Sequence, residues 1–427
     1  MLQKFITFTQ NQQEKITLLM NYLFVLYAFT LPMAFHTEKI IFKLIFILFL
    51  FSGDLKAKLL FAIKNKIFQA MLLFLSVYII WIIGSEHKAL AIAKLKIFSQ
   101  YIFLFPIYLT SIQEEFKEKI LNSFLFAIFI SELVSFSMLF NLNLPLIHYT
   151  GFGSYVPFFY TYSQYAILLI ISLSIALYII LSKKLSKLLY IIYSIFFIIS
   201  TVNVFILDSK LGYILYFIST ASVLIYILKD KISKTKVFLF FIMIAVSYSL
   251  AFNFSATFAA RIHNIGSDIQ SAYKEHIFKG STGKRIAWNI YGIKVYLEHP
   301  LLGVGTFDHI DLVSKEIQPL QPKHVTHQSD LLGFNNTITP VMSTLHSEYL
   351  DHLVQFGPIG LLVLFYLFYT IYKTDSTTPT LQMLKYLLLI NIILYIFVNY
   401  FFILSQLAKI FFFLIALSIA GYKGEKR

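Results

Sequence analysis

Histidine 346 stands where a polar stretch gives way to an apolar run that continues to Tyr372. A neutral imidazole titrates near physiological pH, so it can act as a general base or proton shuttle. The positive end of a helix dipole disfavours imidazolium, and His346 lies at the start of a predicted helix, so we expect a neutral ring. An interfacial histidine that only anchors the span is the alternative, and the residue type alone leaves both open.

A basic residue marks a second candidate upstream of His346. The stretch STGKRIAWNIYGIKVYLEHP reads as a helix that Ser281 or Thr282 caps and Pro300 ends, with Arg285 in its first turn. A guanidinium near the outer membrane surface suits a pyrophosphate, because it can grip two oxygens with parallel hydrogen bonds. A solvated or headgroup-binding arginine is the reading that competes with this one.

Lys210 is the third candidate, in the stretch LDSKLGY at the outer end of a predicted span. Together with Asp208 it places a charged pair at a helix junction, which is a frequent mark of a functional site in membranes. A lysine that snorkels to the interface beside a counter-ion explains the same residues.

Two glycines follow His346 on one predicted helix face. Leu350, Leu353, Gly357 and Gly360 share that face, and the glycines would let a neighbouring helix approach closely. Pro358 predicts a kink or a restart of the helix at this point.

Other polar residues carry weaker signals. His324, His327 and Asp330 have a spacing compatible with a metal ion, but no set of strong ligands surrounds them, so no metal site is predicted. Asp351 and His352 follow His346 on the same helix, where they either tune it or pack as buried polar groups.

The composition decides which kind of fold must position these residues. The chain has 427 residues, of which 58% are hydrophobic and 13% charged, and apolar runs of helix length recur along it. This pattern predicts an all-α polytopic membrane protein. The sequence contains no cysteine, which excludes thiol nucleophiles, thiolate metal sites and disulfides. The net charge is +14, but most basic residues sit in short loops, where they set topology and do not indicate nucleic-acid binding.

About twelve transmembrane spans are predicted. They lie near 16–35, 38–52, 67–84, 95–111, 120–140, 160–181, 188–206, 211–228, 237–255, 349–372, 381–400 and 403–420. Lysine-rich loops near 56–66, 183–187 and 229–236 then fall on one side, as does the C-terminal tail, which makes that side the cytoplasm and both termini cytoplasmic. We therefore divide the chain into spans one to nine (1–254), a periplasmic loop domain that carries helices (255–345), and spans ten to twelve with a short tail (346–427).

This arrangement resembles the O-antigen ligase family, whose wider group includes O-antigen polymerases and protein O-oligosaccharyltransferases. The family pattern is a histidine followed by serine or asparagine and, about eleven residues later, a Gly-x-x-Gly pair, which His346, Ser347, Gly357 and Gly360 fit. The stretch from Gly283 to Gly305 resembles the family's arginine helix and the Pro-x-x-Gly-x-Gly turn after it, with Pro300, Gly303 and Gly305 in place.

The resemblance implies a reaction. A glycan on undecaprenyl pyrophosphate passes to a sugar hydroxyl of lipid A-core at the periplasmic face of the bacterial inner membrane, with no metal or nucleotide cofactor. His346, Arg285 and Lys210 are then the expected catalytic residues. The expected substrate-binding residues are Arg285, Lys210, Ser347 and Tyr349, and the expected structural glycines are Gly303, Gly305, Gly357 and Gly360.

The sequence departs from the family pattern at one position, and two other functions remain as alternatives. Where the family commonly has Ser-Arg-Gly, this chain has Ser209, Lys210 and Leu211, so the charge stays but the two-pronged grip is lost. A polymerase uses the same donor, but its second outer loop is often basic, and the loop near 141–159 has no Lys or Arg. A transporter or flippase would need ionisable residues near the bilayer midplane, where Glu132 and Lys409 are the candidates.

Overall fold

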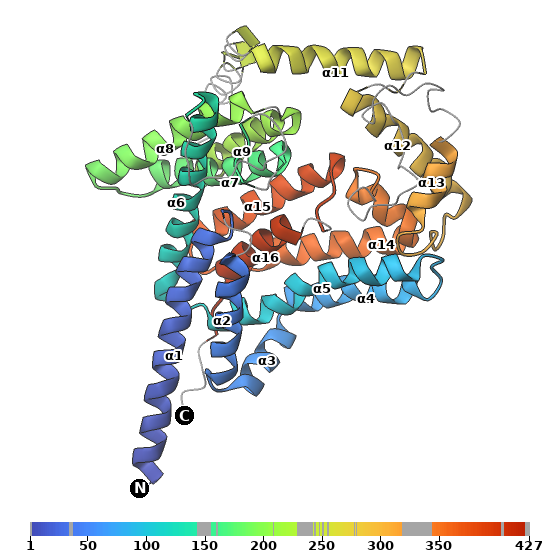
Figure 1. The fold of residues 1–427 in the computed structure, drawn as a ribbon. Coiled ribbons are helices and arrows are strands. Elements are labelled where there is room, and N and C mark those ends of the chain that lie inside the picture. Colours follow the sequence, from blue (N-terminus) through green and yellow to red (C-terminus); the bar gives the residue numbers. More distant parts are fainter. Residues whose placement is uncertain are drawn as a thin grey trace.

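The computed structural model describes residues 2–33, 37–142, 155–158, 161–207, 209–228, 256–276, 280–317, 344–402 and 405–422, with Phe278 and a few residues between 242 and 253. The regular elements in this part of the chain are α-helices, in agreement with the predicted all-α class (Figure 1). They are α1 (Leu2–Thr30), α2 (Thr37–Phe51), α3 (Leu55–Lys64), α4 (Lys66–Ile82), α5 (Lys88–Ser111), α6 (Glu114–Leu139), α7 (Tyr162–Ser182), α8 (Lys187–Ile206), α9 (Lys210–Leu228), α11 (Ala256–Lys274), α12 (Gly280–Glu298), α13 (His309–Ile317), α14 (Glu348–Lys373), α15 (Pro379–Val398) and α16 (Ser405–Ile419).

Seven of the described helices are long and apolar enough to cross a membrane, and the chain is a multi-pass membrane protein. These seven are α5, α6, α7, α8, α9, α14 and α15. The pair α3 and α4 passes the same test when taken together, although the two helices meet at an angle of 76°, and it would make an eighth span. Asn65 lies at the bend, where its side chain accepts hydrogen bonds from the N–H groups of Ile67 and Phe68 and so caps α4.

Of the remaining predicted spans, three correspond to helices and one lies mostly outside the described residues. The spans near 16–35, 38–52 and 403–420 overlap α1, α2 and α16, which are helices but do not meet the full length and hydropathy test. Most of the span near 237–255 lies outside the described residues. The count of twelve spans and the side on which each loop lies therefore remain predictions.

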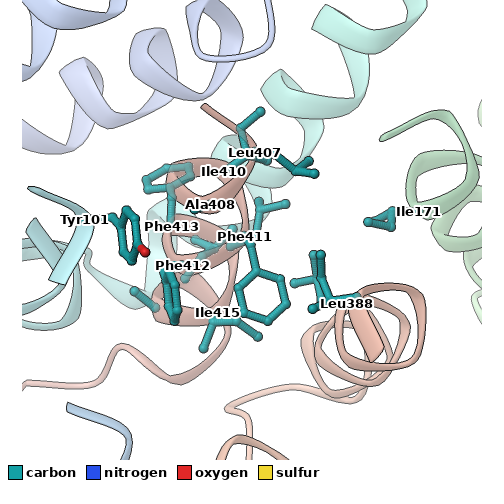
Figure 2. Close-up of a cluster of buried hydrophobic side chains, with 14 of the residues drawn as sticks. Tyr101, Ile171, Leu388, Leu407, Ala408, Ile410, Phe411, Phe412, Phe413 and Ile415 are labelled. Carbon is teal, nitrogen blue, oxygen red and sulfur yellow. The ribbon is translucent and has the colours of Figure 1, made fainter. Parts of the chain in front are cut away.

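The helix α16 forms the centre of the apolar core. Its residues from Leu407 to Leu417 are buried, which suits a helix that is apolar around its circumference except for Lys409, whose Nζ lies 3.4 Å from Glu38 Oε1. Figure 2 shows side chains leaving this helix in several directions, with Tyr101 of α5 on one side and Leu388 of α15 on another. The ring of Phe412 stacks on Tyr101 with centroids 5.1 Å apart. The Tyr101 hydroxyl also donates to Phe402 O at 3.3 Å, which ties the segment before α16 to α5.

The helix α12, which contains the predicted arginine stretch, and the helix α13 after it pack against the start of α14. In Figure 1, α12 and α13 lie beside the amino-terminal part of α14, and α12 also packs on α11. The predicted arginine helix is confirmed as α12, but it begins at Gly280, so Ser281 and Thr282 lie in its first turn and do not cap it. This packing brings the residues of α12 to the beginning of α14, where His346 lies.

Candidate active site

His346 precedes α14 in an uncommon backbone conformation. The next residue, Ser347, is the N-cap, and its hydroxyl oxygen accepts a hydrogen bond from the Leu350 N–H at 3.5 Å. The φ angle of His346 is +53°, in the left-handed region that residues other than glycine rarely adopt. Its N–H donates to Thr344 Oγ1 at 3.3 Å. Such backbone conformations persist where the surrounding structure enforces them, often at functional sites.

Aromatic rings hold the imidazole of His346 on two sides. The indole of Trp288, on α12, stacks on it with centroids 4.6 Å apart and an interplanar angle of 11°. The ring of Tyr400 meets it edge-on at 5.1 Å. The Nδ1 atom of His346 is buried and has no hydrogen-bond partner among the described residues. The ring is therefore oriented by its neighbours while one nitrogen stays unengaged.

Burial keeps this imidazole neutral. It lowers the pKa of His346 to about 3, with the positive charge of Arg285 as the second cause and a side-chain hydrogen bond with Asn399 acting in the opposite sense. The neutral ring expected from the sequence is thus supported, but the main cause is burial and not the helix dipole. A neutral imidazole with an unengaged nitrogen can accept a proton.

Arg285 supplies a cation next to the imidazole. It lies in the first half of α12, and its Nε atom is buried without a hydrogen-bond partner among the described residues. Its positive charge acts on His346. Burial raises the pKa of Tyr400, and the charge of Arg285 opposes that rise. A buried guanidinium N–H that has no acceptor is costly unless a ligand provides one. The arrangement therefore suits an anion beside His346.

Lys210 is linked to the helix that carries Arg285 by a contact with Thr282 of α12. Its Nζ donates to Thr282 Oγ1 at 3.0 Å and lies 3.8 Å from the carboxylate of Asp268, on α11. Asp268 in turn accepts a hydrogen bond from the Thr282 N–H at 3.3 Å. Thr282 and Arg285 are i and i+3 on α12, so they share one face of the helix, and this brings Lys210 toward Arg285. Asp208, which the sequence offered as the partner of Lys210, lies outside the described residues.

A turn after α12 docks on a break in α14. Gly357 has φ +63° and ψ −161°, which interrupts the helix just before Pro358, as the proline predicted. Proline has no N–H to offer to the carbonyl of Val354, four residues earlier. The N–H groups of Val304 and Gly305 bond instead to the carbonyls of Val354 and Gln355, each at 3.0 Å. The break is therefore completed by main-chain hydrogen bonds from the turn.

The close approach at this break needs glycine on both sides. A Cβ atom on Gly357 would collide with the carbonyl of Leu301, and one on Gly303, where φ is +69°, would collide with the carbonyls of Val354 and Gln355. The prediction that Gly357 lets another segment approach is supported, although that segment is the turn and not a neighbouring helix. Gly360 packs against the Phe356 side chain, and Gly305 lies near Asp308 and Ser85.

Two buried carboxylates of α14 hold the backbone on either side of the imidazole. Asp351 accepts hydrogen bonds from Leu345 N–H at 2.9 Å and lies 2.8 Å from His309 Nε2. Glu348 accepts the N–H of Phe401 at 2.7 Å. The segments that flank His346 and Tyr400 are thereby fixed to the first turn of α14.

His352 lies deeper in the protein. Its Nε2 is 3.0 Å from the hydroxyl of Tyr78, and its Nδ1 donates to the carbonyl of Glu348 at 2.7 Å. Asp351 and His352 therefore belong to a buried polar network behind His346, and of the two only Asp351 bonds to the segment that carries it.

Two residues expected to bind substrate have other contacts. The Ser347 hydroxyl caps α14, and the residue is 6% exposed. The Tyr349 hydroxyl donates to Ile393 O at 3.0 Å, and its ring packs near Phe365 and Phe397. These contacts belong to the α14–α15 packing, so substrate binding by Ser347 and Tyr349 stays a prediction. His324, His327 and Asp330 lie outside the described residues. Within the described ranges, no group of three or more metal-binding side chains is present.

Trp288, Asn399 and Tyr400 belong to the site but were not singled out from the sequence. Trp288 is three residues after Arg285 and is one of only 2 tryptophans, which was a usable signal on that helix face. Asn399 and Tyr400 follow an apolar span, and nothing in their spacing connects them to His346.

Residues 195–365 match the family whose description is O-antigen ligase. The chain carries an O-antigen ligase domain. The match contains Lys210 of α9, Arg285 of α12, His346 just before α14, and the break at Gly357 within α14. The chain is thus a membrane enzyme of the O-antigen ligase and polymerase type. Comparison with curated proteins gave no match.

Proposed function

We propose that the chain transfers O-antigen, or a related glycan, from undecaprenyl pyrophosphate to a sugar hydroxyl of lipid A-core. The observation that carries the proposal is the neutral His346, with an unengaged buried Nδ1, beside the unpartnered buried Nε of Arg285. Glycosyl transfer removes a proton from the acceptor hydroxyl and leaves negative charge on the departing pyrophosphate. A base can take that proton, and a cation beside it can stabilise that charge.

The step balances as a single displacement. The acceptor oxygen forms a bond to the anomeric carbon of the donor sugar, and its proton passes to Nδ1 of His346. The bond from that carbon to the pyrophosphate oxygen breaks, and undecaprenyl pyrophosphate leaves as an anion. Arg285 stabilises the charge on that leaving group in a setting where water is partly excluded.

Lys210 gives the leaving group a second cation. It is restrained by Thr282 and Asp268, and its charge is close enough to Arg285 for each to affect the other. Lysine binds phosphate as a point charge, whereas arginine offers a fork of donors. The restraint by two neighbouring side chains compensates in part for the fork that is missing here.

The proposal includes the orientation of the protein. With twelve spans, both termini face the cytoplasm, and the loop domain (255–345) and the site face the periplasm of the inner membrane. The basic loops support this, because Lys183 and Lys184 lie between α7 and α8 and Lys187 begins α8, all at the opposite end of α7 from Tyr162.

A polymerase is the second candidate, since it would use the same donor and the same base. The outer loop near 141–159 has no Lys or Arg, which favours lipid A-core over a second pyrophosphate-linked glycan as the acceptor. The two functions differ in the product, so the product is the readout.

The first test expresses the wild type and His346→Ala in a Gram-negative strain that makes lipid-linked O-antigen but lacks its own ligase. Both proteins are first confirmed in the membrane fraction. We expect the wild type to restore an O-antigen ladder on lipid A-core and His346→Ala to reduce it at least 100-fold, because the proton acceptor is gone. A ladder of normal intensity in His346→Ala would show that the histidine is only an anchor.

A matched control separates the enzyme from a transporter. Glu132 of α6 is fully buried and accepts a hydrogen bond from Ser200, away from the site described above. Glu132→Gln keeps the shape of the side chain and removes only its ability to ionise. An enzyme should retain the ladder in this variant, whereas loss of activity in Glu132→Gln with normal protein levels would favour proton-coupled transport.

A further inference from the structure

The helix α12 and the turn after it carry a row of large apolar side chains that the described residues leave exposed. Ile290, Ile293 and Leu297 recur at helical spacing and are 44%, 48% and 67% exposed. Leu301 and Leu302 follow in the turn and are 78% and 61% exposed. We call these five residues the outer stripe. A continuous apolar surface of this kind is unfavourable in water and indicates an apolar partner.

The other sides of α12 have partners within the protein. A Cβ atom on Gly292 would meet the side chains of Leu345 and Leu350, so this side of the helix packs on the start of α14. Lys294 forms an ion pair with Glu316 of α13 at 2.5 Å. At 3.6 residues per turn, the outer stripe points roughly away from Gly292. The helix is therefore amphipathic, with a packed side, a charged side and an apolar side that is left exposed.

The lower end of the outer stripe is fixed to two membrane helices. The Val304 N–H bonds to the Val354 carbonyl at the break in α14, at 3.0 Å. Trp81, near the end of α4, donates from its Nε1 to Leu302 O at 2.6 Å. These hydrogen bonds set the level of the turn relative to both helices.

That level lies within the apolar part of the membrane. The helix α14 is long and apolar enough to cross a bilayer, and it ends at Lys373. The stretch from Gly357 to Lys373 is about 24 Å long, whereas the hydrocarbon core of a bilayer is about 30 Å thick. With Lys373 at one membrane surface, the break and the turn docked on it lie just inside the opposite surface.

Exposed apolar residues of the two membrane helices continue the outer stripe. Ile359 and Leu362 follow the break in α14 and are exposed, as are Ile80 and Ile83 at the end of α4. In a multi-pass membrane protein, such side chains on a span face acyl chains. Trp81 lies between the two exposed isoleucines, and tryptophan is enriched at the level where acyl chains meet headgroups. The outer stripe is thus continuous with a surface that lipid already covers.

We propose that the outer stripe is embedded among the phospholipid acyl chains of the leaflet on the side of the candidate site, so that α12 is a membrane-bound amphipathic helix and not part of a water-soluble loop. In the proposed orientation this is the periplasmic leaflet. The apolar side enters the acyl chains, and the charged side with Lys294 faces headgroups and water. The inference goes beyond the proposed function and holds whichever glycan is transferred.

This placement has a consequence for the candidate site. Arg285 and Trp288 lie on the side of α12 that faces α14, above the docked turn. Embedding the outer stripe therefore holds Arg285 near the level of the lipid headgroups. Under the proposed function, this is the level at which the pyrophosphate of a lipid-linked donor lies.

The experiment uses the absence of cysteine from the chain. The purified full chain carries one cysteine at a time, Ile293→Cys, Leu297→Cys or Leu302→Cys, and is labelled with bimane and placed in phosphatidylcholine nanodiscs. Glu298→Cys is the matched control, because Glu298 is the exposed neighbour of Leu297 on the charged side of α12. Leu362→Cys is the reference for a lipid-facing position. Lipids with a nitroxide at acyl carbon 5 or 12 quench from the membrane, and iodide quenches from water.

We expect nitroxide lipids to quench bimane at the three stripe positions at least twofold more than at Glu298→Cys. Iodide should quench the stripe positions at least threefold less than Glu298→Cys. The carbon-5 nitroxide should be the stronger quencher on the stripe, because the stripe lies in the outer part of the leaflet. At Leu362→Cys the order should reverse, since Leu362 is about 16 Å from Lys373 and so near the bilayer centre.

Two results would overturn the inference. Iodide quenching of the stripe equal to that of Glu298→Cys, with no effect of nitroxide lipids, would place the stripe in water. Protection from both quenchers would show that another part of the chain or a second copy covers it. Three stripe positions keep the test decisive if one variant does not fold. Since no readout depends on glycan transfer, failure of the proposed function would leave this result unchanged.

Discussion

Histidine 346 combines a strained backbone with a ring that its neighbours hold in place. Its position before an apolar run suggested a neutral base, and the structure supplies burial and Arg285 as the reasons. The sequence contained the motif residues, since they lie in two short stretches. It did not reveal Trp288, Asn399 or Tyr400 as neighbours, because those contacts exist only once α12, α14 and the end of α15 have packed. Contacts between residues that are far apart in the chain produce no periodic pattern in a single sequence.

The buried imidazole makes stability depend on pH. The pKa of His346 is about 3 in the folded protein, below the value of about 6.5 expected when unfolded. The unfolded chain therefore binds a proton that the folded chain does not between these values, so stability is lost as pH falls below about 6.5. Between pH 7 and pH 4.5 the loss from this residue should be about 2.5 kcal/mol.

The check is thermal unfolding of the wild type and His346→Gln at both pH values, followed by intrinsic fluorescence. Since glutamine does not titrate, the wild type should lose more of its Tm on acidification than His346→Gln does. Equal losses in the two proteins would show that the histidine is protonated in the folded state.

At the scale of elements, the turn and the break in α14 act as one unit. Pro358 predicted the break, because a proline in a helix removes one hydrogen bond by a local rule. The docking of Val304 and Gly305 on the freed carbonyls needed the fold, since the two segments are about fifty residues apart. Trp81 of α4 adds a bond from its Nε1 to Leu302 O at 2.6 Å. The turn therefore links α4, α12 and the helix that follows His346.

Gly357→Ala tests this unit. The methyl group would meet the Leu301 carbonyl, and alanine is strained at φ +63°. We expect a loss of about 3 kcal/mol in stability and a marked loss of activity, because the turn and α14 must separate. Gly266→Ala on α11 is the matched control, since a Cβ there has nothing within 4 Å and alanine favours the helix.

Thermal shift assays of the two alanine variants, with the wild type alongside, measure the effect. Gly266→Ala should melt at or slightly above the wild-type temperature. A Gly357→Ala variant as stable as that control would mean that the turn does not need this close approach.

At the scale of the whole molecule, hydropathy predicts where helices lie but does not show that each one crosses the membrane. Apolar runs located helices at eleven of the twelve predicted spans. Among the described helices, seven are long and apolar enough to cross a membrane, or eight with the bent pair. The bend at Asn65 was not predicted, because residues 56–66 were assigned to a lysine-rich loop, whereas Leu55–Lys64 forms the helix α3. The side of the membrane on which each loop lies was predicted from the positions of the lysines. That rule describes how a chain inserts into the membrane, so helix packing does not test it.

The absence of cysteine allows a direct test of the orientation. Single reporters at Lys184→Cys, between α7 and α8, and Ser267→Cys, on α11, have no background thiol in a chain with 0 Cys. In intact cells, a small membrane-impermeant maleimide should label Ser267→Cys at once. Lys184→Cys should react only after the inner membrane is opened. Labelling in the opposite order would reverse the orientation and put the site in the cytoplasm.

The burial of α16 has a consequence for the order in which the protein matures. This helix is the last one described in the chain, yet it lies at the centre, against α5 and α15, and the segment that carries Asn399 and Tyr400 leads directly into it. During synthesis, the earlier helices enter the membrane with that place still unfilled. The neighbours of His346 can settle only after α16 has taken its place, so the candidate site is complete only once this helix has entered the membrane.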